Sequence, residues 1–166
     1  MKISEIKGDA VKLNRTLDDS VLIHVCNDQG VMGSGIALQI KKEHPNTFKA
    51  YRNNYTSYIS GGTNFGGSIS WHSVDRICNL VAQASFGVGA TGKVRYLNYG
   101  WLALCLAGLS DGLFWNHYGK EIRKIIVPVN MGAFRAGGDW EIVKEMIIGV
   151  LNGAVEEIIF CEFDGE

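Results

Sequence analysis

The sequence has no excess of charge of either sign. Its 16 lysines and arginines stand against 17 aspartates and glutamates, which gives a formal net charge of −1. Proteins that hold nucleic acid by neutralising its phosphates need a basic surface, so we expect no strong nucleic-acid surface. The longest apolar run, around 101–109, is about half as long as a membrane span, and the N-terminus lacks the apolar segment of a secretory signal. We therefore expect a cytoplasmic protein with no membrane partner.

The chain also lacks the cysteine and histidine spacings of zinc sites and the paired cysteines of redox motifs. Its four cysteines are far apart and lie in apolar runs: Cys26, Cys78, Cys105 and Cys161. This usage is typical of buried free thiols in a reducing compartment, so we expect no metal site and no cofactor. With 166 residues and no linker, the chain is predicted to form one domain over 1–166, as a monomer.

Glycine, in contrast, is plentiful. The 21 glycines are about 13% of the chain, nearly twice the average share. They gather at 30–35, 61–67, 87–92 and 132–138 rather than in a low-complexity linker. This grouping predicts several main-chain loops that converge on one ligand.

Short apolar strands alternate with helical patterns along the chain. Strands are predicted at 2–7, 21–26, 68–73, 76–83, 124–130 and 155–163. Helices are predicted at 33–43, 46–59, 96–109 and 140–151, with polar connections at 12–20 and 111–121. This alternation predicts an α/β fold with helices on both faces of the sheet.

Three of the glycine-rich loops directly follow a predicted strand, at 27–35, 85–92 and 131–138. Ligands of such folds lie beyond the carboxyl ends of the strands. The first loop runs through Gly33-Ser34-Gly35 into a predicted helix, and a helix N-terminus with nearby glycines suits a phosphate. The three loops together predict a nucleotide or another phosphate-bearing ligand.

Several short motifs match, in order and spacing, a known family. They are Lys7-Gly8-Asp9, Met32-Gly33-Ser34-Gly35-Ile36-Ala37, Ser85-Phe86-Gly87, Val127-Pro128-Val129-Asn130-Met131-Gly132 and Gly137-Gly138-Asp139-Trp140. In this arrangement the chain resembles the macrodomain family. Two segments look most like its ADP-ribose-1″-phosphate phosphatase branch, which includes phage-encoded members: Ile23-His24-Val25-Cys26-Asn27 and Gln83-Ala84-Ser85-Phe86-Gly87.

The resemblance implies a three-layer α/β/α sandwich with a mixed, largely parallel central sheet and a cleft for ADP-ribose. Asp9 would accept a hydrogen bond from the adenine amino group, loop 27–35 would hold the distal ribose, loop 131–138 would wrap the diphosphate, and Phe134 would close over the distal ribose. The ligand-binding residues expected on this basis are Asp9, Ala10, Asn27, Met32, Gly33, Ser34, Gly35, Ile36, Ser85, Phe86, Gly87, Asn130, Met131, Gly132, Ala133, Phe134, Arg135 and Ala136.

The chain departs from the family pattern at two places. Cys26-Asn27-Asp28-Gln29 replaces the common Asn-Ala-Ala-Asn turn, which argues against the hydrolytic asparagine arrangement of the mono-ADP-ribosyl hydrolases. The segment at 83–85 also has no lysine, and Lys93 lies well downstream. A covalent mechanism that depends on lysine is therefore not expected.

His24 and Asp139 are the candidate catalytic residues. His24 matches a histidine of the phosphatase branch and could act as general acid or nucleophile, although a histidine in an apolar strand is often a core residue. Asp139 could accept a proton from attacking water or merely cap the next helix. Asp9 could simply end its strand, and Asn27 could make only an Asx-turn.

The leading functional hypothesis is hydrolysis of ADP-ribose-1″-phosphate to ADP-ribose and phosphate. Phosphoryl transfer depends mostly on positioning and on stabilising charge, which amide-rich loops can supply without a metal. The first alternative is a non-catalytic binder of ADP-ribose, because few acid or base residues lie near the loops. The second is a hydrolase that removes ADP-ribose from protein or nucleic acid.

Overall fold

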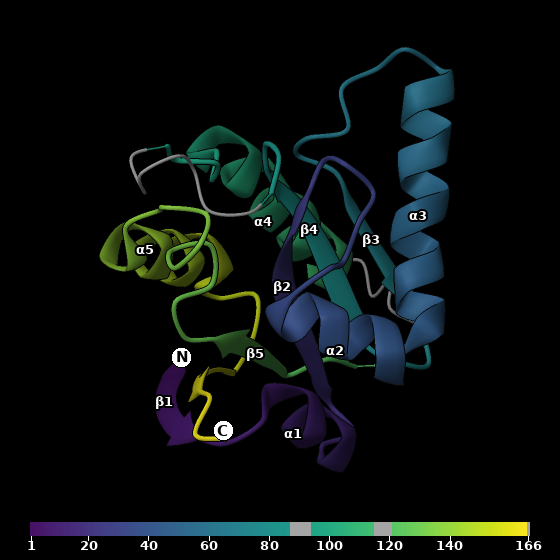
Figure 1. Ribbon diagram of the computed structural model, residues 1–166. Coiled ribbons are helices and arrows are strands. Elements are labelled where there is room, and N and C mark those ends of the chain that lie inside the picture. The colour runs from purple at the N-terminus through teal and green to yellow at the C-terminus, as the bar shows by residue number, and fades with distance from the viewer. Residues whose placement is uncertain (87–93, 115–120, 166) are drawn as a thin grey trace.

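A mixed sheet forms the centre of the computed structural model, which describes residues 1–86, 94–114 and 121–165 (Figure 1). Among these residues, six strands follow the order β1-β6-β5-β2-β4-β3. Neighbouring strands are parallel except that β3, at one edge, runs antiparallel to β4. The strands are β1 (Lys2–Lys7), β2 (Ser20–Asn27), β3 (Ile69–His72), β4 (Ile77–Gln83), β5 (Lys124–Pro128) and β6 (Glu157–Glu162).

Helices cover both faces of this sheet, as Figure 1 shows. On one face α4 and α5 pack against Ile23 and Leu80, while on the other α1 and α2 pack against Leu22 and α3 packs against Val81. The helices are α1 (Ala10–Thr16), α2 (Gly35–Glu43), α3 (Pro45–Ser60), α4 (Tyr99–Phe114) and α5 (Trp140–Leu151). The predicted three-layer sandwich with a mixed, largely parallel sheet is confirmed.

The central strands are apolar toward both layers. Leu22 and Ile23 are neighbours in β2, and each is fully buried, on opposite faces of the sheet. A strand buried on both faces reads as a continuous apolar run, which is why β2, β4 and β5 could be recognised in the sequence. The four cysteines are buried and none of them forms a disulfide, as predicted. None of the described helices is long and apolar enough to span a membrane.

Two predictions about helices were wrong. The segment predicted as a polar connection at 12–20 contains most of α1, whose Ala10 and Val11 are buried and whose N-cap is Asp9. The helix α4 continues to Phe114, five residues beyond its predicted end, so that Asp111 lies inside it. In both cases a short polar sequence stays helical because its apolar neighbours are buried against the sheet.

Candidate functional site

A cleft of about 1040 Å³ opens at the carboxyl ends of β2, β4, β5 and β6. Its walls come from the segment after β2, the segment after β5 and the chain that follows β1 and β6. Most of the predicted ligand-binding residues line it, together with His24. These are Ala10, Asn27, Met32, Gly33, Ser34, Gly35, Ile36, Phe86, Asn130, Met131, Gly132, Phe134, Arg135 and Ala136.

Some predicted residues do not line the cleft. Asp9, Ser85, Ala133 and Asp139 are absent from its walls, and Gly87 lies outside the described residues. Lining residues that the sequence did not single out include Gln39 and Phe163. The three predicted loops therefore do meet at one sheet edge, as far as the structure describes them.

The first wall of the cleft ends in the N-terminus of α2. Gly35 begins this helix with a positive φ of 58°, a conformation that glycine adopts without strain. Ser34 occupies the N-cap position, but its side chain makes no capping hydrogen bond. The N–H groups of the first turn therefore have no side-chain cap and open into the cleft, where an anion could accept from them.

The second wall is the tight loop after β5. Asn130 and Gly132 both have positive φ, 65° and 74°, and the Gly138 N–H donates to the Gly132 carbonyl over 3.0 Å. The positive φ favours glycine at position 132, and a Cβ there would also lie 2.9 Å from Leu97 Cδ1, so that this side chain would have to shift. The loop presents Phe134, which is 83% exposed, at the mouth of the cleft.

Asn27 lies in the first wall, and its side-chain amide already makes hydrogen bonds within the protein. Its Oδ1 accepts from the Gln29 N–H over 2.9 Å and from the Tyr51 hydroxyl over 2.8 Å, while Nδ2 donates to the Val31 carbonyl over 2.9 Å. The first of these bonds is the Asx-turn considered above as the simpler role of Asn27. Only one Nδ2 hydrogen is left for a ligand, so Asn27 mainly shapes the wall.

Asp28 ties this wall to the segment after β4. Its Oδ1 accepts from the Ser85 N–H over 2.9 Å, and its own N–H donates to the Gln83 carbonyl over 2.9 Å. Ser85 has a positive φ of 82° in this arrangement. The main chain of Ser85 therefore holds the wall together, and the adjacent Phe86 lines the cleft.

His24 is at the floor of the cleft and has no exposed surface. Asn79 donates through both hydrogens of Nδ2, to the Thr47 carbonyl and to Ser70 Oγ, so its Oδ1 must face His24 Nε2, 2.6 Å away. Since Oδ1 can only accept, Nε2 carries the proton and donates. Burial lowers the pKa of His24 to about 4, although the bond to Asn79 acts in the opposite direction.

A neutral, buried and hydrogen-bonded histidine fits the core role better than the catalytic one. At neutral pH His24 has no extra proton to give, and the residue, although it lies at the floor of the cleft, has no solvent-exposed surface. The general-acid role of His24 therefore has no support in this geometry.

Asp139 caps α5. Its Oδ1 accepts from the Glu141 N–H over 2.9 Å, and its own N–H donates to the Tyr99 hydroxyl over 2.8 Å. The capping role considered for Asp139 is thus present, whereas its carboxylate is outside the cleft walls. Trp140, next in the chain, packs edge-on against Phe160, with ring centroids 5.8 Å apart.

Asp9 caps α1 at the edge of the cleft. Its Oδ1 accepts from the Lys12 N–H over 3.0 Å and its Oδ2 from Gln39 Nε2 over 2.9 Å. Burial acts to raise the pKa of Asp9, but these hydrogen bonds outweigh it and hold the pKa below its ordinary value. Asp9 is therefore an ionised acceptor at neutral pH.

The charge of the cleft favours an anionic ligand. No aspartate or glutamate is among the described residues of its walls, and Arg135 adds a positive charge to the uncapped helix N-terminus. In the part of the chain that the structure describes, no three histidine, cysteine, aspartate or glutamate side chains form a group that could hold a metal ion.

No protein-family model matches the chain. Among curated proteins, an ADP-ribose 1″-phosphate phosphatase of Neosartorya fischeri is 42% identical over 59 residues, which are 36% of this chain and 28% of that protein. The enzyme of the same name from Meyerozyma guilliermondii is 34% identical over 67 residues, 40% of this chain and 38% of that protein. The matches thus span only 28–38% of the length of these relatives.

Solved structures match over nearly the whole chain. The macrodomain of Mycobacterium tuberculosis DarG has a TM-score of 0.71 at 22% identity and covers 96% of both chains. That of Thermus aquaticus DarG has a TM-score of 0.69 at 21% identity and covers 98% of both. Thermosipho africanus DarTG, solved in complex with ADP-ribose, has a TM-score of 0.68 at 15% identity and covers 98% of this chain and 42% of that one.

The chain therefore has the macrodomain fold. Together with the curated relatives, these structures confirm the resemblance to the macrodomain family that the motifs indicated.

Proposed function

We propose that this protein binds ADP-ribose derivatives in the cleft and hydrolyses ADP-ribose-1″-phosphate to ADP-ribose and phosphate. The observation that carries the proposal is the N-terminus of α2, which opens without a side-chain cap into a cleft whose walls contain Arg135 and, among the described residues, no carboxylate. Phosphate groups suit such a site because they accept from several N–H groups at once.

The similar proteins support the choice of ligand. The curated relatives are named ADP-ribose 1″-phosphate phosphatases, and one structural neighbour was solved with ADP-ribose. A cleft of about 1040 Å³ has room for a dinucleotide-sized ligand of this kind. The fold, the charge and the relatives all point to the same class of ligand.

In the proposed reaction, one water is added across the terminal phosphoester. The main-chain N–H groups of the α2 N-terminus and of loop 131–138 would hold the phosphates, and Arg135 would balance charge that develops in the transition state. We propose that no metal takes part, which predicts full activity in the presence of a chelator. The single-domain, monomeric and cytoplasmic state expected from the sequence belongs to this proposal, and size-exclusion chromatography tests the monomer.

A non-catalytic binder is the second candidate, and a specific observation favours it. Of the two expected catalytic residues, His24 is fully buried and Asp139 caps a helix outside the cleft walls. Such a protein would bind ADP-ribose tightly but would not catalyse hydrolysis of any ADP-ribose derivative.

Two measurements on the wild-type chain separate these functions. Calorimetric titration with ADP-ribose tests binding, and a malachite-green assay on ADP-ribose-1″-phosphate tests phosphate release. Binding together with release supports the phosphatase, and binding without release supports the binder. Failure to bind ADP-ribose at millimolar concentration contradicts both.

A further inference from the structure

The proposed hydrolysis needs a group that holds the attacking water, and the expected catalytic residues do not supply one. His24 is fully buried, and its Nε2 carries a proton that is donated to Asn79. Asp139 is outside the cleft walls, and no aspartate or glutamate is among the described residues of those walls. Among the described residues, the group that accepts a hydrogen bond from this water is therefore uncharged.

Gln83 lies at the end of β4, where the pairing with β2 changes register. Cys26 pairs with Val81. The next residue of β2, Asn27, pairs with Gln83, so β4 has one extra residue at this point. Such a shift turns the side chains beyond it and is frequent beside active sites. Here Asn27 Oδ1 accepts from Tyr51 of α3, and its neighbour Gln83 lines the cleft.

The amide of Gln83 is held in one direction. Its Nε2 donates to the Ser85 carbonyl over 2.8 Å, and because a carbonyl can only accept, the atom at that distance is nitrogen rather than Oε1. Ser85 has a positive φ of 82°, and strained main chain of this kind is typical of functional sites. No group of the described residues donates to Gln83 Oε1, so this oxygen is free to accept.

The wall beside Gln83 contains the proposed phosphate site. Asn27, which pairs with Gln83, donates to the Val31 carbonyl over 2.9 Å, and the uncapped N-terminus of α2 follows at Gly35. Gln83 therefore adjoins the wall that would hold a phosphate. Because its amide is uncharged, Gln83 can lie near a phosphate without the repulsion that a carboxylate would bring.

We propose that Gln83 Oε1 holds the water that attacks the terminal phosphorus. This inference rests on the proposed function, since it concerns the same reaction. The water oxygen bonds to phosphorus while the bond from phosphorus to the ribose oxygen breaks. One water proton stays on the attacking oxygen, where Gln83 Oε1 accepts a hydrogen bond from it. The other moves through a phosphate oxygen to the departing ribose oxygen. Phosphoryl transfer needs an oriented water more than a strong base, so an amide oxygen is sufficient.

The test compares two substitutions of Gln83 in phosphate release and in affinity for ADP-ribose. Gln83→Met removes both the acceptor and the bond to Ser85. Gln83→Lys can still donate to the Ser85 carbonyl but has no acceptor, and its charge favours phosphate binding. In both variants kcat for ADP-ribose-1″-phosphate should fall by about a hundredfold, the lower limit for a group that acts on a proton of the reaction. In Gln83→Lys, calorimetry should find ADP-ribose bound at least as tightly as by the wild type.

Gln29→Met is the matched control. Gln29 Nε2 donates over 2.7 Å to Asp28 Oδ1, the same oxygen that accepts from the Ser85 N–H. Gln29 is exposed and outside the cleft walls, so its variant should release phosphate at the wild-type rate. If Gln83→Met does not fold by circular dichroism, Gln83→Lys gives the decisive readout, because it keeps the bond to Ser85.

The inference and the proposed function fail in different ways. If Gln83 only supports the main chain of Ser85, Gln83→Lys releases phosphate at the wild-type rate. That outcome would overturn the role of Gln83 and leave the phosphatase intact. A wild type that binds ADP-ribose but releases no phosphate would overturn both and support the non-catalytic binder.

Discussion

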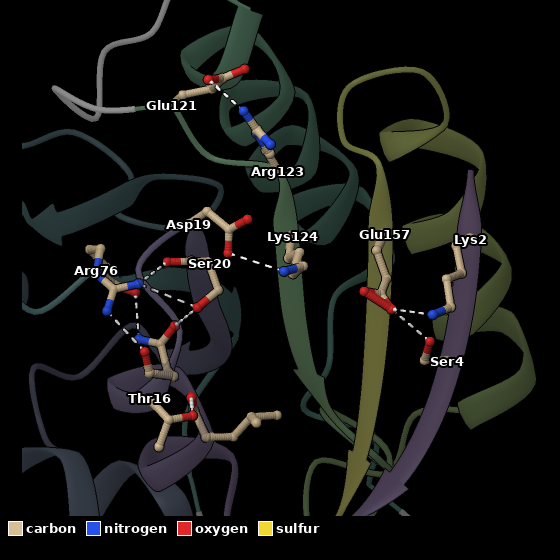
Figure 2. A network of polar contacts seen from close by, with 12 residues as sticks. Lys2, Ser4, Thr16, Asp19, Ser20, Arg76, Glu121, Arg123, Lys124 and Glu157 are labelled. Carbon is tan, nitrogen blue, oxygen red and sulfur yellow. Dashed lines mark hydrogen bonds and ion pairs between the residues drawn. The ribbon is translucent and has the colours of Figure 1, made fainter.

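The two ends of the parallel strands differ in where their polar groups find hydrogen-bond partners. At the amino end, side chains satisfy one another across the strands, as Figure 2 shows. Lys124 Nζ lies 3.3 Å from Asp19 Oδ1, and Glu157 Oε2 accepts from Ser4 Oγ over 2.7 Å. The guanidinium of Arg76 donates to the main-chain carbonyl of Ser20 over 2.7 Å.

At the carboxyl end, the walls of the cleft are largely main chain, and the helix that opens there has no side-chain cap. Side chains that approach this end, such as Asn27 and Asp28, mostly bond to the loops themselves. The difference shows how one sheet separates stability from binding. The polar groups of the amino end are hydrogen-bonded within the protein, whereas at the carboxyl end the main-chain N–H groups of the α2 N-terminus have no side-chain cap and are available to a ligand.

The largest expected effect is a pH dependence of stability that comes from His24, beneath the cleft. Its pKa is about 4 in the folded protein and near 6.5 when unfolded, so below pH 6.5 only the unfolded chain takes up the proton. The free energy of unfolding should therefore fall by roughly 3 kcal/mol between pH 6.5 and 4. Urea denaturation across this pH range measures it.

His24→Leu removes this titration and is the comparison for it. The variant should be less stable at pH 7 by about 1–3 kcal/mol, because Asn79 Oδ1 loses its donor, but its stability should vary less with pH. If the pH dependence matches that of the wild type, His24 is not the group responsible. A folded variant that binds ADP-ribose but releases no phosphate would restore the catalytic role of His24.

The next effect tests the amino end. Arg76→Met removes a charged donor from two main-chain carbonyls, those of Ser20 and Asn14, and should lower the free energy of unfolding by about 2 kcal/mol. Affinity for ADP-ribose, measured on the folded protein, should not change. Arg123→Met is the control, since its ion pair with Glu121 is exposed and should add nothing measurable. Weaker binding in Arg76→Met would mean that the two ends are coupled.

A smaller effect tests the carboxyl end. A Cβ on Gly33 would meet no protein atom within 4 Å, and the residue has no positive φ, so Gly33→Ala should leave stability unchanged. If phosphates approach the main chain here, the affinity for ADP-ribose should fall by about tenfold through lost close contacts. Gly149→Ala, in α5 and equally free of clashes, should bind as the wild type does. Equal binding by both variants would exclude a ligand at Gly33.

The smallest effect concerns Asp139. Because this residue caps α5, Asp139→Ala should cost about 1 kcal/mol of stability. Phosphate release should stay within a fewfold of the wild type. A loss of a hundredfold or more at unchanged affinity would instead assign a proton-transfer role to Asp139. Asp139→Asn, which can still accept from the Glu141 N–H, separates the cap from the charge.

The sequence was sufficient to predict the position of the cleft. The apolar runs of β2, β4 and β5 are recognisable because these strands are buried on both faces, and loops after parallel strands must meet at one edge. The glycines at 33–35 and 132–138 then identified the walls.

The roles of single side chains could not be predicted in the same way. Whether His24 reaches the cleft depends on Asn79, whose orientation is set by Thr47 and Ser70 from elsewhere in the chain. Gln39 gave no signal in the sequence, since a glutamine in an amphipathic helix is usually a solvated residue. Its partner Asp9 is 30 residues away, and only the folded chain brings the two together.

The hydroxyl of Tyr51, fully buried beneath the first wall, has a kinetic and thermodynamic consequence for recognition. Its single hydrogen is shared between the two oxygens of Asn27, each 2.8 Å away, and so the hydroxyl anchors the wall to α3 before any ligand arrives. A wall that is rigid in advance spares association the entropy of ordering it. Removing that one hydroxyl should therefore slow capture and shorten residence of the nucleotide without touching any surface that the nucleotide contacts.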